Sequence, residues 1–284
     1  LRKACIEKEG VTDTWMLWAK MEEKERGGGE YSKENTALWI YRKACEEKHA
    51  EGQVWLAWAQ LEEKERGAGE YSKENTALWI YRKACLEKGA NSAVWLAWAQ
   101  MEEKERGAGE YSEENTALWI YRKACLEKGA DSAVWLAWAQ MEEKERGAGE
   151  YSEENTALWI YRKACLEKGA DGVVWAAWAQ LEERKDNIGE YDQEYTVRWI
   201  LNEGIKHFPN SAQLYSVSAD LELRCKMSGR AREMLRKGAK YNEYNMNKLA
   251  ILELYCGNID TDSEYCTNKL MAKMKLKKEL SFGA

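Results

Sequence analysis

Apolar residues recur at spacings of three and four through most of the chain, which is the period expected of amphipathic helices. Over residues 132–146 the apolar positions are Val134, Trp135, Trp138, Ala139 and Met141. The pattern predicts a helix from Ser132 to Arg146, capped at its start by Asp131 or Ser132. The glycines of the GAG stretch, residues 147–149, are expected to end this helix.

A second helix is predicted after the turn RGAGEYSEE. Ser152 is its expected N-cap, and Gly169 is its expected end. One face of this helix carries Ala157, Ile160, Tyr161, Ala164 and Cys165. Proline occurs once, at Pro209, so nearly every segment is free to be helical. The chain is therefore expected to be all-α.

The helix pair repeats every 40 residues. Four consecutive units begin at Ala37, Ala77, Ala117 and Ala157. A helix pair that cannot bury its apolar faces alone must pack on its neighbours, which predicts a right-handed α-solenoid of stacked antiparallel helix pairs. Residues 1–200 are expected to hold near-identical repeats, the first of them truncated, and residues 201–284 to hold divergent repeats and a C-terminal cap.

An aromatic triplet marks the first helix of each pair. In one unit it is Trp95, Trp98 and Glu102, and it recurs in the neighbouring units with the same spacing. The pattern resembles the tetratricopeptide superfamily, and in particular its HAT (half-a-TPR) branch. The period of 40 residues exceeds the ~34 residues usual in that superfamily because the turn is longer. The resemblance implies a concave groove, lined by the first helices, that holds an extended peptide or a partner helix.

The groove positions follow by counting from the first tryptophan of each triplet. Position +1 carries a leucine in three units, and positions +5, +8 and +9 carry an amide, a carboxylate and a cation. A glutamine can pair with both N–H and C=O groups of a peptide. The same residue types also suit a solvated helix face, and this alternative stays open. The predicted partner-binding residues are Leu56, Gln60, Glu63, Lys64, Leu96, Gln100, Glu103, Lys104, Leu136, Gln140, Glu143, Lys144, Gln180, Glu183 and Arg184.

Other prominent residues are assigned to structure. The tryptophans recur where helices must touch, so they are expected in the core rather than in a platform for nucleic-acid bases. Glu102 is expected to pair with Arg122 or Lys123 of the second helix. Tyr111 is expected to act as a hydrophobic staple on the helix that follows it.

The sequence offers no constellation typical of an enzyme. The two histidines, His49 and His207, lie outside metal and nucleophile motifs. Adjacent carboxylates such as Glu102 and Glu103 point about 100° apart on a helix and cannot share one substrate. We expect no catalysis, no cofactor and no metal. The eight cysteines contain no CxxC pair and are expected to be buried free thiols, which favours a cytoplasmic protein.

Charge and hydropathy narrow the class of partner. No apolar run approaches the ~20 residues needed to cross a bilayer, so no membrane association is expected. The net charge of −6 disfavours direct RNA contact, despite the basic YRKA segments and the run Lys273, Lys275, Lys277 and Lys278. The predicted function is a non-enzymatic scaffold for a protein or peptide partner. The alternatives are a scaffold in an RNA-processing assembly, which the HAT resemblance implies, and head-to-tail self-association.

Overall fold

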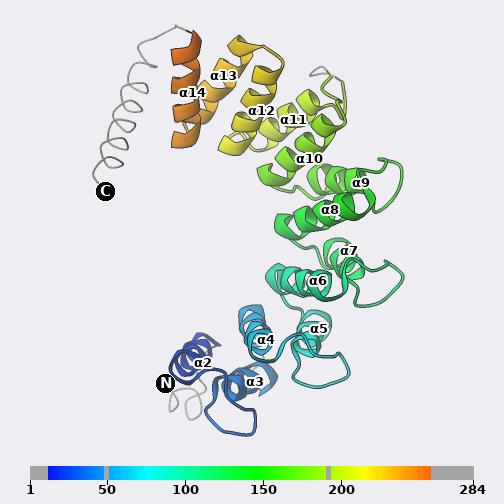
Figure 1. Ribbon diagram of the computed structural model, residues 1–284, viewed down its shortest axis with the longest axis vertical. Coiled ribbons are helices and arrows are strands. Elements are labelled where there is room, and N and C mark those ends of the chain that lie inside the picture. The colour runs from blue at the N-terminus through cyan, green and yellow to red at the C-terminus, as the bar shows by residue number, and fades with distance from the viewer. Residues whose placement is uncertain (1–11, 48–50, 190–192, 257–284) are drawn as a thin grey trace, which may run out of the picture. The chain divides into compact units, whose positions relative to one another are not determined.

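In the computed structural model, which describes residues 12–47, 51–189 and 193–256, all regular structure is helical (Figure 1). The chain divides into two compact units, residues 1–160 and residues 161–284. The all-α prediction is therefore confirmed. The predicted boundary at residue 200 marks where the repeats stop being similar in sequence. The boundary between the two compact units, after residue 160, instead separates two groups of helices that pack together.

The first unit is a stack of helix pairs. The pair of α6 and α7 is representative: Leu118 N donates a hydrogen bond to Ala108 O at 3.1 Å, so α7 begins beside the end of α6 and runs back along it. Helix α6 also packs against α4 and α8, so the first helices form one layer and the second helices another (Figure 1). The helices are α2 (Thr12–Arg26), α3 (Ala37–Glu47), α4 (Gly52–Arg66), α5 (Ala77–Glu87), α6 (Ser92–Arg106), α7 (Ala117–Glu127), α8 (Ser132–Arg146) and the start of α9 (Ala157–Arg162).

The second unit continues helix pairing with a less regular sequence. Helix α10 packs against α11 and α12, α12 against α13, and α13 against α14. A small core in this unit joins Ala219, Ala231, Leu235 and Leu249. After the end of α9 the elements are a π-helical turn (Lys163–Glu167), α10 (Gly172–Arg184), α11 (Val197–His207), α12 (Ala212–Arg224), α13 (Ser228–Ala239) and α14 (Glu243–Cys256).

The helix predicted over residues 132–146 begins and ends as expected. Helix α8 spans Ser132–Arg146, and Asp131 Oδ1 accepts a hydrogen bond from Val134 N at 3.4 Å. Gly147 follows with a φ of 80°, a left-handed value that glycine adopts without steric cost. The local sequence therefore determined both ends of this helix.

The predicted N-cap of the second helix, Ser152, is wrong. The cap is the threonine before the helix: Trp159 N donates to Thr156 Oγ1 at 3.4 Å. Asn155, with a φ of 65°, turns the chain immediately before the cap, so residues 150–155 form turns instead of a first helical turn. In the preceding unit a Cβ on Gly109 would lie 2.5 Å from Thr116 Cβ, which explains the glycine at this position of the loop.

The tryptophans of the first helices lie in the core, as predicted. Trp95 is 2% exposed and Trp98 is fully buried, and the ring of Trp119 meets the Trp98 ring edge-on at 6.3 Å between centroids. Trp119 itself is only half-buried, with the Lys123 ammonium 5.0 Å from its ring centroid. The predicted burial of cysteines holds for Cys45, Cys85, Cys125 and Cys165, whereas Cys225 is half-buried. Cys5, Cys266 and the Cys256 side chain lie outside the described residues.

The long loops that carry Tyr31, Tyr71 and Tyr111 are each tied to the next repeat by that tyrosine. Tyr111 Oη donates to Glu142 Oε2 at 2.8 Å and accepts from Trp138 Nε1 at 2.9 Å. Tyr71 makes the same bridge to Glu102 and Trp98, at 2.6 Å and 2.8 Å. The predicted role of Tyr111 as a hydrophobic staple is wrong, because its hydroxyl supplies polar partners that the buried indole and carboxylate require.

The expected pairing of Glu102 with Arg122 or Lys123 is also wrong. Arg106, one turn later on the same helix, donates to Glu102 Oε1 at 2.8 Å. Lys123 instead lies over the Trp119 ring. The buried carboxylate is therefore satisfied by its own helix and by the tyrosine of the preceding loop.

Replacement of Tyr71 by phenylalanine tests this bridge. We expect the free energy of unfolding to fall by about 1–3 kcal/mol, because the buried Trp98 indole N–H loses its acceptor and Glu102 loses a donor. Urea denaturation measures the change. Tyr244→Phe is the control, since the Tyr244 side chain is exposed and its loss of a hydroxyl should cost less than about 0.5 kcal/mol. Equal stability of the Tyr71→Phe and Tyr244→Phe proteins would contradict the assignment.

Candidate partner-binding face

The predicted groove residues share one side of the first helices. Leu96 and Glu103 are half-buried on α6, and Gln100 and Lys104 are exposed. Helices α4 and α8 show the same pattern at the equivalent positions, and α10 in the second unit presents exposed Gln180 and Arg184. Since α4, α6 and α8 pack side by side, the face recurs on adjacent helices of the first unit. Whether this face binds a partner remains a prediction.

The charged residues of the face pair with one another across successive helices. Lys104 Nζ lies 3.3 Å from Glu63 Oε1, and Lys144 Nζ lies 3.2 Å from Glu103 Oε1. The Glu103 carboxylate accordingly raises the pKa of Lys144. The carboxylate at position +8 of one repeat thus forms an ion pair with the lysine at position +9 of the next repeat. Exposed ion pairs add little stability, so their main effect here is to cancel the charge of the face.

The same pairing extends into the divergent repeats of the second unit. Arg224 lies at position +9 when the count starts from Tyr215, and its Nε and Nη2 each donate to the Glu183 carboxylate at 2.7 Å. Arg224 was not among the residues predicted for this face. The count from Tyr215 would have found it, since Tyr215 occupies the place of the first tryptophan.

The glutamines of this face, unlike its glutamates and lysines, take no part in the ion pairs. The exposed amides of Gln60, Gln100 and Gln140 make no hydrogen bond to any other described residue. An amide carries both donors and an acceptor. Adjacent helices of the first unit therefore present a row of unpaired amides between half-buried leucines.

A hollow of about 410 Å³ lies on this face in the second unit. Three of its lining residues were predicted from the sequence and three were not. Asp220, one of the latter, lies at position +5 from Tyr215, the position that carries glutamine in the other repeats. Asp220 pairs with Lys248 Nζ at 2.6 Å, so this position is neutralised as well. The lining residues are Gln180, Glu183, Arg184, Val217, Asp220 and Arg224.

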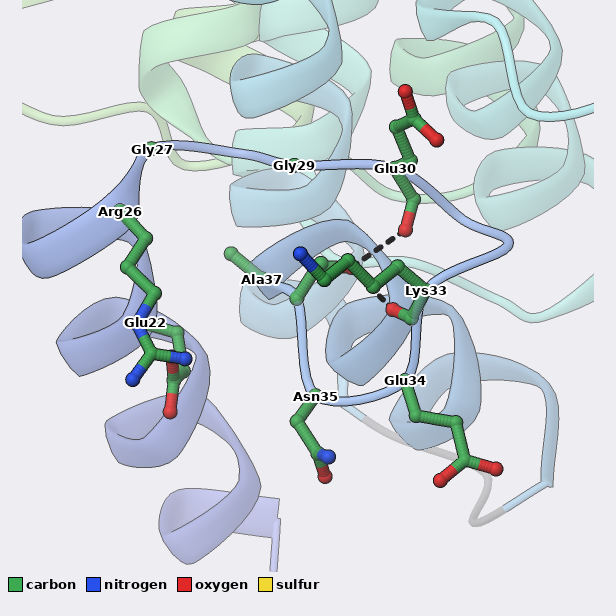
Figure 2. Close-up of a pocket in the computed structure, with 10 residues that line it drawn as sticks. Glu22, Arg26, Gly27, Gly29, Glu30, Lys33, Glu34, Asn35 and Ala37 are labelled. Atoms are coloured by element: carbon green, nitrogen blue, oxygen red, sulfur yellow. Dashed lines mark hydrogen bonds and ion pairs between the residues drawn. The ribbon is translucent and has the colours of Figure 1, made fainter.

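The long loops enclose hollows of a second kind. One, of about 310 Å³, lies between the end of α2 and the loop that follows it, against Glu22, Arg26 and Asn35 (Figure 2). Another, of about 490 Å³, occupies the equivalent place one repeat later, against Glu62, Arg66 and Asn75. Both hollows have mixed charge.

The remaining sequence predictions bear on metals and membranes. Within residues 12–47, 51–189 and 193–256 no cluster of three histidine, cysteine or acidic side chains could hold a metal ion. No described helix combines the length and the apolar character needed to span a bilayer. His207 stacks on the Trp175 ring at 5.6 Å between centroids. His49 and the lysines Lys273, Lys275, Lys277 and Lys278 lie outside the described residues.

Comparison with known proteins returns distant structural matches at low sequence identity. No family model matches the sequence, and no curated protein matches it. The structure is similar to that of the human IFIT1 dimer with m7Gppp-AAAA, at 14% identity and a TM-score of 0.41, over 95% of this chain and 61% of that one. It is also similar to the assembly chaperone of RpL4, Acl4, at 13% identity and a TM-score of 0.32, over 96% of this chain and 99% of that one. The assignment itself rests on the packed helix pairs of this chain. The fold is a helical-repeat solenoid.

Two features distinguish this helical repeat. The first is the set of ion pairs between positions +8 and +9, which leaves the glutamines as the accessible polar groups of the face. The second is the long loop, whose tyrosine binds to the next repeat.

Proposed function

We propose that the chain is a non-enzymatic scaffold that binds an extended segment of a protein or peptide on the first-helix faces. The observation that supports this is the row of exposed, unpaired amides of Gln60, Gln100 and Gln140 on adjacent packed helices. An extended peptide has free N–H and C=O groups along its length, and each glutamine can bond to one of each.

The charge pairing favours a partner without strong net charge. Glu63 and Glu103 are matched by Lys104 and Lys144, so neither an acidic nor a basic segment would find unmatched counter-charges along this part of the face. Direct binding of RNA is disfavoured for the same reason, and by the net charge of −6.

Two finer assignments belong to this proposal. The triplet of Trp95, Trp98 and Glu102 supports membership of the repeat in the HAT branch of the tetratricopeptide-like proteins. The burial of Cys45, Cys85, Cys125 and Cys165 as free thiols suits a reducing compartment, and we place the protein in the cytoplasm.

Affinity capture from a lysate, with and without RNase, tests the proposal. The test variant carries Gln60→Lys, Gln100→Lys and Gln140→Lys, which remove the amides and add three charges. The control carries Ser72→Lys, Ser112→Lys and Ser152→Lys, which add the same charge on exposed loop positions.

Partners of the binding face should resist RNase, remain bound to the serine variant and be lost from the glutamine variant. Capture that RNase abolishes and that the glutamine variant retains would overturn the proposal. It would favour instead an RNA-processing scaffold that acts through the basic YRKA segments.

A further inference from the structure

Half-buried leucines form a row across the first helices of the first unit. Leu56, Leu96 and Leu136 occupy position +1 of α4, α6 and α8, and these helices pack side by side (Figure 1). The ion pairs between positions +8 and +9 show that equivalent positions of successive repeats lie next to one another. Because the axes of packed helices are about 8–10 Å apart, this leucine row offers one apolar contact about every 8–10 Å.

A row of amides runs beside the leucine row. Gln60, Gln100 and Gln140 each follow the leucine of their helix by four residues. That spacing keeps the amide on the same side of the helix, about 6 Å farther along its axis. The ion pairs come next along each helix. A ligand that crosses the three helices therefore meets one leucine and one unpaired amide per repeat, beside a border without net charge.

The spacing of the leucine row distinguishes between extended conformations of a ligand. In a polyproline II helix every third residue lies on the same side, about 9.3 Å from the last. In a β-strand the side chains on one face recur about every 6.7 Å, so they would drift out of step with the leucines. Of these two conformations only polyproline II places one side chain on each helix of the face.

The amide row distinguishes polyproline II from an α-helix. Residues seven apart on an α-helix lie on one face about 10.5 Å apart, which would also suit the leucines. The backbone N–H and C=O groups of an α-helix are bonded within it, so the amide of Gln100 would find no backbone partner there. A polyproline II helix has no internal hydrogen bonds and leaves these groups free. The two rows together therefore favour polyproline II.

The leucine and amide rows coincide on three helices only among the described residues. Position +1 of α10 in the second unit is Ala176, which is 1% exposed and offers no comparable contact. Helix α2 has the half-buried Met16 at position +1, but Lys20 replaces the amide at position +5. The matched surface thus corresponds to three turns of a polyproline II helix, or about nine residues.

We propose that the partner segment is a polyproline II helix with an aliphatic side chain at every third position, lying across α4, α6 and α8. The inference rests on the proposed function and specifies the segment that this function recognises. The aliphatic side chains contact Leu56, Leu96 and Leu136, and the glutamine amides bind backbone C=O and N–H groups. The other positions carry proline or uncharged residues, because the ion pairs leave no counter-charge beside them and proline lowers the entropy cost of ordering the segment.

A synthetic nine-residue peptide, Leu-Pro-Pro repeated three times and blocked at both ends, serves as the probe. The control peptide has the same composition, with three consecutive leucines between two runs of three prolines. Consecutive residues of a polyproline II helix point to three different sides, so only one of these leucines can face the protein. Calorimetric titration of the 284-residue protein should give a dissociation constant on the order of 100 μM for the probe. The control peptide should bind at least about tenfold more weakly.

Variants of the protein test each row separately. The triple variant Leu56→Ala, Leu96→Ala, Leu136→Ala keeps good helix formers at position +1 and should weaken probe binding by about tenfold or more. The triple variant Gln60→Ala, Gln100→Ala, Gln140→Ala should weaken it by about tenfold. The matched control carries Ser72→Ala, Ser112→Ala and Ser152→Ala on exposed loop positions and should bind the probe as the wild type does.

Equal affinity for the probe and the control peptide would overturn the inference, as would unchanged probe affinity in the leucine variant. Tighter binding of a helical peptide with leucines seven residues apart would also overturn it and would assign the face to an α-helix. The lysate capture described above does not depend on the spacing of a peptide. If RNase-resistant partners are lost from the glutamine-to-lysine variant while the two peptides bind equally, the scaffold function stands and only the polyproline II segment is rejected.

Discussion

Replacement of Trp98 by alanine is expected to lower the free energy of unfolding by about 3–5 kcal/mol. Trp98 is fully buried, and its ring centroid lies 5.7 Å from that of Trp95 and 6.3 Å from that of Trp119. The substitution would leave a cavity between α6 and α7 and would also remove the donor to Tyr71 Oη. Two effects therefore add at one site: lost packing within the repeat and a lost bond to the preceding loop.

Urea denaturation followed by circular dichroism measures this loss. Stability in a repeat array is a sum of repeat and interface contributions, so the transition should be fitted with a nearest-neighbour model. Gln100→Ala on the same helix is the control, and its exposed side chain should contribute less than about 0.5 kcal/mol. A Trp98→Ala protein that loses less than about 1 kcal/mol would show that the tryptophans do not hold the core together.

The helices were predictable because the repeats are nearly identical and strongly periodic. The limits of α8, Ser132 and Arg146, could be placed from the cap at Asp131 and the glycine after the last turn. The positions of Trp135 and Trp138 within the period also placed them correctly in the core. Periodicity reports which side of a helix is buried, and capping residues report where the helix stops.

Contacts between repeats could not be predicted in this way. Tyr71 meets Trp98 and Glu102 across separations of 27 and 31 residues, and Glu63 meets Lys104 across 41. No local pattern indicates that a loop tyrosine crosses to the next repeat. Tyr111 and Glu102 were for that reason assigned partners on the nearest helix.

The divergent repeats retain the buried glutamate of this arrangement. In α12 the position of the second tryptophan is held by Ser218, so an indole donor is absent there. Glu222 is 1% exposed and accepts from Arg198 Nε of α11 at 3.0 Å. A guanidinium from the packed helix thus donates to this carboxylate. A buried charge requires such a partner.

Alkaline pH is expected to destabilise the protein steeply. Tyr41, Tyr81 and Tyr121 are each 1% exposed, and burial raises the pKa of all three hydroxyls far above the ordinary value of about 10. Burial likewise raises the pKa of the Cys85 and Cys125 thiols. These groups therefore remain protonated in the folded protein at a pH that ionises them in the unfolded chain.

The sign of the effect follows from this difference. Below about pH 8.5 both states hold these protons, and the groups contribute no pH dependence. Above about pH 8.5 for the thiols, and above about pH 10 for the tyrosines, only the unfolded chain releases protons, so unfolding becomes more favourable as the pH rises. Each tyrosine should remove about 1.4 kcal/mol of stability per pH unit until the folded-state pKa is reached.

Urea midpoints measured between pH 8 and pH 11 test this prediction. The decline should be shallow up to about pH 10 and steep beyond it. Lysines also lose their charge near this pH, so the comparison is made between proteins that differ only in tyrosines. The Tyr81→Phe and Tyr121→Phe double variant removes two hydroxyls that form no bridge between repeats, and it should flatten the slope by about 1.4 kcal/mol per pH unit for each residue replaced. If the wild-type and double-variant slopes coincide, the core tyrosines are not the groups that destabilise the fold in alkali.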